Sequence, residues 1–557
     1  MNNTYEWFDM NGKTTNFENS SLLSTQVHDS SVNMMLSKIY SDKTNSYTDC
    51  CIMFNGSKIS TRLLIKRCAW MVGILMMLFC TQAWTQKQAR DKTEDKAQNK
   101  AQNKIDQSHS SSNVAQSSKK TTRANKFWFG SYGRVGFSSN LDGGEGQKRQ
   151  ITAYAPRLIE DNYLELDWGY WVHRSRNAQV KTVFTLAFFD QFFHYNGQNT
   201  TTTAIRRAFL EAEKLWGTSL WMSVGSRWLR GNDIYLMNFW PLDDLNSMGL
   251  TVGTRGTRHE GFLHIGFNRL ANDKQQQYVA VPAASQFGAE EILFLNRQRL
   301  LLAALYERRY LQKSGWGWKW KIYGEYHYLP AGERALEGSY TEVEALSDDQ
   351  GVIAGVQLGL WGLGHSQNHL NLWARYTRGL ANFDELGMPS SVDLNQRSWL
   401  SQEWRVALAG NWTTGNFWSV QWGSYLRSYQ DADHLTVDFD DRVEGSFVVR
   451  PQLQFGIFTP AIEASVQWSQ AQDANPQDLS VDAAQIHQLA FMPSFTFDDK
   501  KTMGSFSRPQ IRLIYAISWL NQAALARYAY DDPRSQAKQV HYIGTRAEWW
   551  FGRGGGY

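Results

Sequence analysis

Three pairs of residues combine an aromatic and a charged side chain at positions i and i+2. They are Tyr132 with Arg134, Tyr163 with Glu165, and Glu548 with Trp550. In a β-strand both members of such a pair project to the same side. An aromatic ring offers a flat apolar face, and a charged group offers strong hydrogen bonds. Because sugars have apolar C–H faces and hydroxyl edges, the pairs suit weak carbohydrate binding. The alternative is that each pair only fills space.

Motifs for catalysis or metal binding are weak by comparison. His365 and His369 have the i, i+4 spacing of a helical metal site, but they flank a glycine-rich turn before a strand-like segment. The sequence has no G-x-S-x-G nucleophile motif and no carboxylate pair whose spacing favours acid–base chemistry. We therefore expect no catalytic residue, no metal and no cofactor.

The elements that position the pairs are predicted to be strands. In 127–137, Phe127, Phe129 and Phe137 share one face, and Tyr132 and Arg134 share the other. Similar alternation occurs at 163–168, 404–408, 418–422 and 543–551. Period-two alternation with no helical interludes is typical of a transmembrane β-barrel. Nine stretches rich in Gly, Asn, Asp and Thr lie between such segments, and nine long loops imply about eighteen strands. They are 138–150, 190–204, 230–248, 271–290, 330–350, 382–398, 428–443, 470–486 and 529–538. The expected fold class is an all-β transmembrane antiparallel barrel.

The composition agrees with this fold without deciding it. Aromatic residues make up 14% of the chain, there are only 11 prolines in 557 residues, and the mean hydropathy is −0.48. Aromatic girdles combined with a polar lumen give a barrel such a balance, although a soluble β-sandwich can share it. The formal net charge of +4 is too small to indicate a nucleic-acid partner.

The first 126 residues are expected to lie outside the barrel. Residues 62–83 resemble a secretory signal peptide, with three basic residues, the apolar run CAWMVGILMMLFC at 68–80, and cleavage after Ala83. The run is too short for a transmembrane helix, which needs roughly 18 apolar residues. A lipoprotein signal ending at Cys80 fits less well because Phe79 is large. All four cysteines precede residue 81, so the expected mature chain has none.

Two flanking segments complete this organisation. Residues 1–61 are polar and lie upstream of the signal, so we interpret them as an N-terminal extension from a start site assigned too early. Residues 84–126 are low-complexity and suit a periplasmic linker, although the KAQN repeat leaves a short coiled coil open. Residues 127–557 form the expected outer-membrane barrel domain.

The paired residues lie in motifs that resemble the maltoporin and sucrose-porin family. FGSYGRVG at 129–136 resembles the family's first strand, and PRLIEDNYLEL at 156–166 resembles its second strand region. AFLEAEKLWG at 208–217 is similar to the stretch before the constriction strand, and VGSRWLRGNDIYLMNFWPLDD at 224–244 resembles the entry into an inward-folded third loop. The resemblance implies an eighteen-stranded barrel, a homotrimer and diffusion of oligosaccharides along an aromatic path.

The resemblance also implies individual roles. The aromatic slide would consist of Tyr132, Tyr163, Phe506 and Trp550, and the polar track and constriction would consist of Arg134, Arg157, Glu165, Arg230, Asp233 and Trp240. Three positions depart from the family pattern, because Leu210 and Gly231 replace arginines and Asn238 replaces an aspartate. No clear aromatic occupies 198–203, where the family donates a slide residue to a neighbouring subunit. These departures leave the substrate open between maltodextrin, sucrose and another oligosaccharide.

We therefore expect a sugar-selective channel for maltodextrins or related oligosaccharides. It would lie as a homotrimer in outer-membrane lipid of a Gram-negative bacterium. A general diffusion porin or a structural barrel would explain the signal and the alternation, but not the aromatic and charged pairs. A secreted carbohydrate enzyme or lectin would explain only the aromatic residues.

Overall fold

The computed structural model describes residues 51–54, 57–60, 126–191, 200–284, 287–336, 340–382, 392–415, 417–433, 441–497 and 506–552. The chain divides into two units, 1–82 and 83–557. In the first unit, β1 (Cys51–Phe54) and β2 (Ser57–Ser60) pair as an antiparallel hairpin inside the segment interpreted as an extension. The expected signal peptide at 62–83 and the linker at 84–125 lie outside the described residues.

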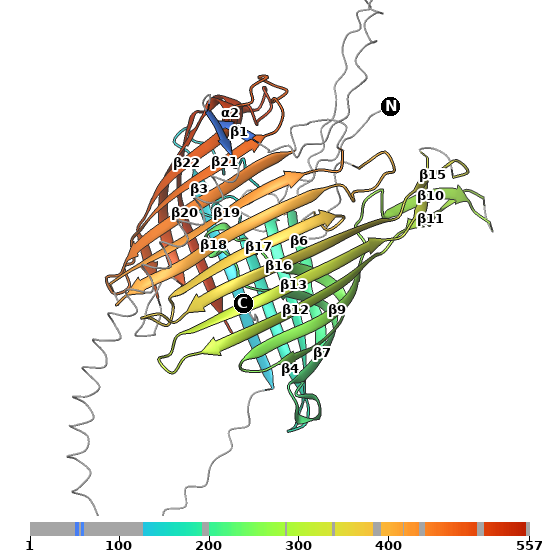
Figure 1. The fold of residues 1–557 in the computed structure, drawn as a ribbon, viewed down its shortest axis with the longest axis horizontal. Helices are drawn as coiled ribbons and strands as arrows, with labels where there is room; N and C mark the ends of the chain where they lie inside the picture. Colours follow the sequence, from blue (N-terminus) through green and yellow to red (C-terminus); the bar gives the residue numbers. More distant parts are fainter. Residues whose placement is uncertain are drawn as a thin grey trace, which may run out of the picture. The chain divides into compact units, whose positions relative to one another are not determined.

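The second unit is a closed antiparallel barrel of eighteen strands within the described residues (Figure 1). The first seven are β3 (Phe127–Ser139), β4 (Tyr163–Arg174), β5 (Gln179–Gln191), β6 (Thr200–Glu213), β7 (Leu220–Arg230), β8 (Asp244–Arg255) and β9 (His259–Asn268). The next six are β12 (Arg299–Leu311), β13 (Gly317–Leu329), β16 (Asp349–Trp361), β17 (His369–Gly379), β18 (Gln402–Thr414) and β19 (Trp418–Gln430). The last five are β20 (Arg442–Leu453), β21 (Ala461–Ala471), β22 (Ala484–Met492) continued by β23 (Ser494–Thr496), β24 (Gln510–Leu520) and β25 (Gln539–Phe551). The predicted fold class is confirmed.

Closure of the barrel joins the two ends of the domain. β25 pairs with β3 from Ile543 opposite Ser139 to Phe551 opposite Ser131. Pro493 lies between β22 and β23, which both pair with β24. Proline has no N–H to donate, so it interrupts the ladder there. Closure leaves the sheet without an open edge, as a strand-built structure needs in a bilayer.

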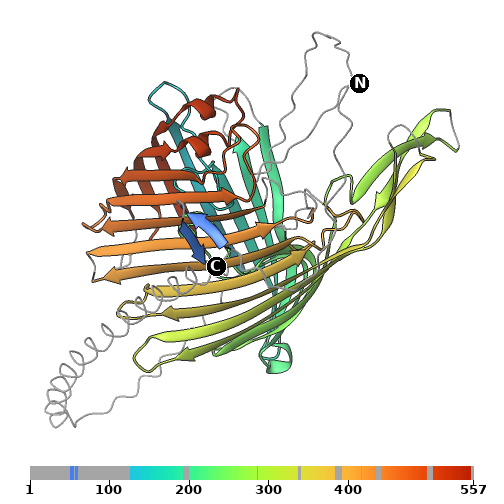
Figure 2. The ribbon, with the colours of Figure 1, turned by 45° about the horizontal axis from the view of Figure 1, so that its top comes forward.

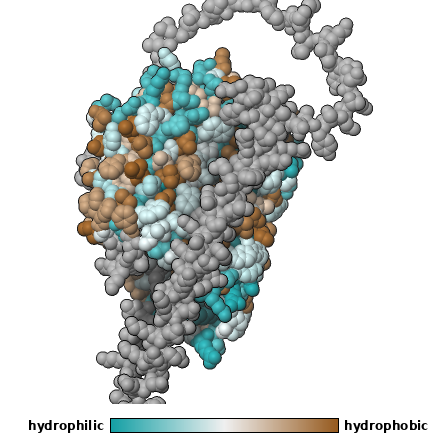
Figure 3. Space-filling view, turned by 60° about the vertical axis from the view of Figure 1, so that its left-hand side comes forward, coloured by the Kyte–Doolittle hydropathy of each residue, from teal (hydrophilic) through white to brown (hydrophobic). Residues whose placement is uncertain are grey.

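Alternation gives the barrel two different faces. On β18, Trp404 is 61% exposed, whereas the neighbouring Arg405 is 2% exposed. Figure 3 shows apolar residues gathered over the outer side of the barrel. The inward face carries charged and amide side chains, which need hydrogen-bond partners that lipid cannot supply. The predicted alternation in 127–137, 163–168, 404–408, 418–422 and 543–551 therefore corresponds to lipid-facing and lumen-facing residues.

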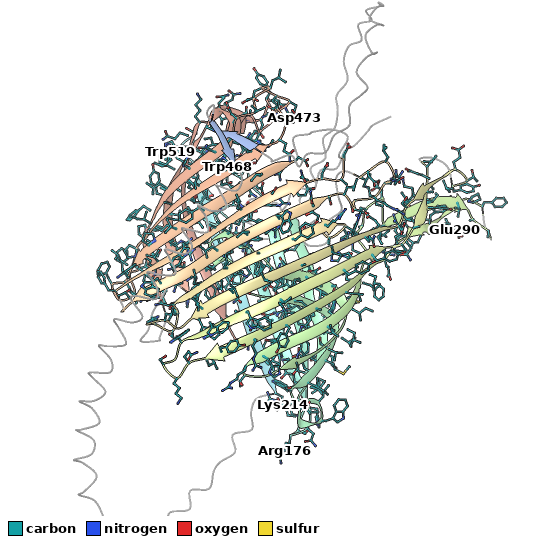
Figure 4. The ribbon with its side chains drawn as sticks, viewed as in Figure 1. Arg176, Lys214, Glu290, Trp468, Asp473 and Trp519 are labelled. Atoms are coloured by element: carbon teal, nitrogen blue, oxygen red, sulfur yellow. The ribbon has the colours of Figure 1, made fainter. Side chains whose placement is uncertain are left out.

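The two ends of the barrel differ in the length of their connections. Turns such as 175–178 and 256–258 are short, and the connections at the other end are long. Figure 4 labels Arg176 and Lys214 in the short turns, and Glu290 and Asp473 at the other end. Short turns are periplasmic in barrels of the outer membrane, so we call the two ends the turn end and the loop end.

Additional short elements decorate the connections. Two ribbons, β10 (Gln276–Pro282) with β11 (Ala289–Asn296) and β14 (Gly332–Ala335) with β15 (Val343–Leu346), extend beyond the loop end (Figure 2). Within the described residues, the helical elements are η2 (Leu215–Gly217), η3 (Tyr235–Met237), α2 (Gln522–Leu525) and η5 (Pro533–Gln536). Among the described residues, no helix has the length and apolarity to cross a bilayer.

Two long connections fold into the barrel instead of projecting from it. In the constriction loop, 231–243, Ile234, Leu236 and Leu242 are at most 2% exposed and pack against the inner wall. In the first inward loop, 140–162, the backbone N–H of Ala153 donates to Glu444 Oε1 at 2.9 Å, and that of Tyr154 donates to the Tyr425 hydroxyl at 3.0 Å. The first inward loop thus crosses to the opposite wall.

The first inward loop is longer than the predicted loop 138–150. The segment 156–166, which resembles the family's second strand region, includes the end of this loop and the start of β4 at Tyr163. Arg157 therefore lies in the first inward loop. Its backbone N–H donates to the carbonyl of Leu236 at 2.9 Å, so this loop is bonded to the constriction loop.

Candidate functional site

A run of aromatic rings follows the inner wall from β4 toward the turn end. Ring centroids are 5.9 Å apart for Tyr163 and Tyr132, and 6.5 Å apart for Tyr132 and Trp550. Trp550 lies 6.2 Å from Tyr235, which lies 5.6 Å from Phe506. The rings are partly exposed. The four aromatic residues predicted from sequence, Tyr132, Tyr163, Trp550 and Phe506, are therefore brought together in one row, which we call the aromatic run.

Tyr235 completes the run and was not singled out in the sequence. It belongs to η3 of the constriction loop, where no strand periodicity indicates which way a side chain points. Its hydroxyl donates to Glu548 Oε2 at 2.6 Å, and Arg508 Nη2 donates to the same hydroxyl. Burial alone would raise the pKa of the Tyr235 hydroxyl. The positive charges of Arg508, Arg512 and Arg157 outweigh this effect, so the pKa lies below its ordinary value.

Behind the run lies an ion-pair network built around Glu548. This carboxylate is 1% exposed and contacts three guanidinium groups. Arg512 Nη2 lies at 2.7 Å, Arg508 Nε at 2.9 Å and Arg157 Nη2 at 3.3 Å. The Arg508 guanidinium also lies 4.5 Å from the centre of the Trp550 ring. The network therefore holds the rings from behind through cation–π contacts.

A second carboxylate extends the network. Glu160, in the first inward loop, contacts Arg157 Nε at 2.9 Å and lies 3.6 Å from both Arg134 Nη1 and Arg546 Nη1. Burial raises the pKa of Glu160, and these arginines lower it to a value below the ordinary range. We call the connected set the arginine network: Arg134, Arg157, Arg508, Arg512, Arg546, Glu160 and Glu548.

The polar groups beside Tyr163 depend on a β-bulge. In the pairing of β5 with β6, Thr185 faces Arg207 and Leu186 faces Ile205, so Arg206 is an extra residue. A bulge can aim two successive side chains to one side. Arg207 Nη2 lies 2.6 Å from Asp167, and Arg206 Nε lies 3.9 Å from Glu165, on the same face of β4.

Glu165 and Leu210 also have definite places around this bulge. The Tyr163 hydroxyl donates to Glu165 Oε1, and Arg206 Nη1 donates to that hydroxyl at 3.0 Å. Glu165 therefore lies beside the run, as the sequence indicated. Leu210, expected to occupy an arginine position of the track, is 46% exposed and lies on the outward face of β6.

Arg230 and Trp240 lie outside the aromatic run. The Arg230 guanidinium stacks between two indoles, 3.2 Å from the centre of Trp228 and 3.9 Å from that of Trp240. It also pairs with Asp244. Gly231, the other departure, lies against the Asp243 carboxylate and the Lys321 ammonium group, which would have to shift to admit a Cβ there.

Asp233 faces a cavity on the turn side of the constriction loop. The cavity measures about 560 Å³ and is also lined by Tyr235, Phe506, Lys319, His369 and Gln421. Burial raises the pKa of Asp233, which Arg157 and Arg230 only partly offset. Neither amide atom of the buried Gln421 has a hydrogen-bond partner among the described residues. The cavity thus presents aromatic, amide and charged groups to whatever enters it.

The opposite side of the lumen is sealed. The Tyr154 ring of the first inward loop stacks on Phe239 of the constriction loop at 3.7 Å, and the Tyr425 ring meets both edge-on. Arg405 lies 4.9 Å from the Tyr154 centroid and 5.0 Å from that of Phe239. These contacts pack the two inward loops against β18 and β19, and Gln421 of β19 still lines the cavity on the turn side.

A closed barrel with an apolar outer face, a polar inner wall and loops folded into the lumen defines an outer-membrane porin. The sequence model of the LamB porin family matches residues 127–551. The chain therefore belongs to the LamB porin family. The family and the barrel together indicate a channel rather than an enzyme.

Solved structures of other porins resemble the barrel with low scores. OprD from Pseudomonas aeruginosa is 10% identical over 77% of this chain and 94% of that chain, with a TM-score of 0.36. Pseudomonas aeruginosa OpdK with vanillate is 10% identical over 77% and 99%, with a TM-score of 0.34. Acinetobacter baumannii OccAB1 is 9% identical over 76% and 96%, with a TM-score of 0.36. At these scores the likeness carries no argument. No match is found among curated proteins.

Proposed function

We propose that this porin is a saccharide-selective channel for maltodextrins or related oligosaccharides. The observation that carries the proposal is the aromatic run, with centroid spacings of 5.6–6.5 Å. Spacings of this size let the apolar face of one sugar ring leave one aromatic ring as it meets the next. A row of modest contacts binds a solute without trapping it, as conduction requires.

Polar groups beside the run supply the complementary chemistry. Arg134, Arg157 and Glu165 lie next to Tyr132 and Tyr163, and their charged groups exchange hydrogen bonds with sugar hydroxyls. Asp233 and the cavity on the turn side continue the path toward the periplasm. In this mechanism the solute moves by diffusion and no bond is broken.

The proposed assembly is a homotrimer in outer-membrane lipid. Closed barrels with apolar outer faces are suited to side-by-side packing, and the family resemblance implies three copies. Each pore of the trimer would conduct independently through its own aromatic run.

Single-channel conductance in a planar bilayer tests the function and the trimer together. The purified full-length protein is titrated with maltotriose and then with sucrose. We expect saturable block of the ion current, with each insertion closing in three equal steps. Current that stays constant with both sugars would instead favour a general diffusion porin.

A further inference from the structure

The arginine network carries more positive than negative charge. Its five arginines face two glutamates, which leaves an excess of three positive charges among the connected groups. The excess is held at low exposure, since the side chains of Arg157 and Arg512 are 8% exposed. Buried charges are usually balanced because desolvation penalises an uncompensated ion.

Three further carboxyl groups lie close to the network, and one of them, Glu165, is 3.9 Å from Arg206 and so compensates that arginine. Asp161 is exposed at the end of the first inward loop, and its carbonyl rather than its carboxylate accepts from Arg134 Nε at 3.0 Å. Asp233 lies in the constriction loop, where burial raises its pKa. With all three counted as ionised and Arg206 included, six arginines face five carboxylates, so one positive charge remains in excess among these groups.

The accessible edge of this positive region lies at Tyr163. The Arg134 guanidinium is 5.0 Å from the ring centre and that of Arg206 is 5.8 Å from it. Their side chains are 14% and 24% exposed, in contrast to 1% for Arg508. Tyr163 is thus a partly exposed ring with two reachable guanidinium groups over it. Guanidinium groups bind carboxylates with paired, charge-assisted hydrogen bonds.

We infer that the channel prefers acidic saccharides, and that Arg134 and Arg206 beside Tyr163 receive the carboxylate of a uronic-acid unit. The inference rests on the proposed function and adds the substrate class. A neutral sugar can stack on the aromatic ring but leaves the excess positive charge unbalanced. A uronate can stack on the ring and also balance this charge with its carboxylate. Fields from charged lumen walls also raise the local concentration of counter-ions.

Block of the ion current by two saccharides of equal ring number tests the inference. The probes are maltotriose, which is neutral, and trigalacturonate, which carries a carboxylate on each ring. For the unaltered protein we expect trigalacturonate to block at a roughly tenfold lower concentration, because hydrogen bonds to charged groups are the stronger ones. The preference should shrink at high salt, because added ions screen the charges. Equal block by the two saccharides at low salt would overturn the inference.

Two charge changes of opposite sign separate this effect from damage to the fold. Arg134→Gln should lower the preference for trigalacturonate and Glu160→Gln should raise it, by about twofold per unit charge at roughly 10 Å in water. Arg397→Gln, an identical substitution at an exposed loop residue 47% exposed, is the matched control and should change neither block. A stronger preference for trigalacturonate in Glu160→Gln cannot result from unfolding of the protein. If neither Arg134→Gln nor Glu160→Gln inserts into bilayers, block of the unaltered protein by the two saccharides still tests the acidic preference.

The outcomes separate this inference from the proposed function. Block by maltotriose with no advantage for trigalacturonate would overturn the acidic preference and leave a saccharide channel. Absence of block by both saccharides would overturn the proposed function, and the inference with it. Stronger block by trigalacturonate, weakened by Arg134→Gln, would support both.

Discussion

The two sides of the lumen use the same residue types for different purposes. Beside β18 and β19, Tyr154, Phe239 and Tyr425 pack around Arg405, whose side chain is 1% exposed. Beside β3 and β25, rings such as Tyr132 and Trp550 are held equally closely by arginines but remain partly exposed. Both sides therefore combine aromatic rings with paired charges.

The contrast shows that accessibility, rather than residue type, separates a solute path from a packed wall. On the sealed side Phe239 and Tyr425 are 3% and 4% exposed, and only Tyr154 is partly exposed. On the open side the rings also contact arginines, but all of them remain partly exposed. An aromatic residue beside a charged one is therefore not by itself a binding site.

The largest effect is expected from removing a charge on the sealed side. Glu403 is 0% exposed, contacts Arg405 Nη2 at 2.9 Å and also pairs with Arg427. Glu403→Gln should lower the free energy of unfolding by about 3–5 kcal/mol, because an arginine charge would lose its buried partner. The measurement is denaturant unfolding followed by tryptophan fluorescence. The concentration for saccharide block should not change.

The matched variant on the open side sharpens this contrast. Glu548→Gln changes a carboxylate that is also buried and contacts three arginines. It should lower stability and also change saccharide block, because Tyr235 and Trp550 would lose the group that orders their arginines. If Glu403→Gln altered block as strongly as Glu548→Gln, the division into a sealed and an open side would be wrong.

A smaller effect is expected from shortening the aromatic run. Tyr132→Ala removes the ring between Tyr163 and Trp550, so saccharide block should weaken by about two- to tenfold, equivalent to about 0.5–1.5 kcal/mol for an aromatic contact. Ion conductance should stay the same or increase. Tyr132→Phe keeps the ring and loses only the hydroxyl, so its block should stay close to that of the unaltered protein. If saccharide block were unchanged in Tyr132→Ala, Tyr132 would not contact the saccharide on its path.

Opening the sealed side should have a milder consequence for the solute. Tyr154→Ala removes the ring that stacks on Phe239, at a cost to the loop–loop contact of about 1 kcal/mol. Ion conductance should rise and become noisier as the first inward loop loosens, while saccharide block changes little. Tyr154→Phe retains the stack and serves as the control. Unchanged conductance and noise in Tyr154→Ala would show that this contact does not close the lumen.

The barrel and its faces could be predicted because strand alternation is a local property. Phe137, 76% exposed, and Trp404, 61% exposed, were assigned to faces from their immediate neighbours alone. The eighteen strands followed from counting long loops. Neither inference needed contacts between residues distant in the sequence.

The site could be predicted only where it lies on regular strands. Tyr235 was missed because its direction depends on partners 273 and 313 residues away, Arg508 and Glu548. Arg206 was missed because a bulge breaks the period of two. Arg157 was placed near the site through the family resemblance alone, since a loop folded into the lumen has no sequence period.

The smallest effect concerns the cavity on the turn side, where Asp233 titrates. Because burial raises its pKa, the carboxyl takes up a proton as pH falls before an ordinary aspartate would. Loss of this negative charge makes the lumen more positive, so the preference for chloride over potassium should increase as pH falls. For one charge at roughly 10 Å in water the change is about twofold.

Reversal potentials in a potassium chloride gradient, measured between neutral and acidic pH, follow this change. Asp233→Asn should prefer chloride more than the unaltered protein does at neutral pH, and the two proteins should converge at acidic pH, because the variant's side chain is permanently neutral. His369 lines the same cavity, and its protonation would also favour anions. The difference between the two proteins therefore isolates Asp233. If the unaltered protein and Asp233→Asn had identical pH profiles, Asp233 would not face the conducting path. The solute path of the open side would then extend only as far as Phe506.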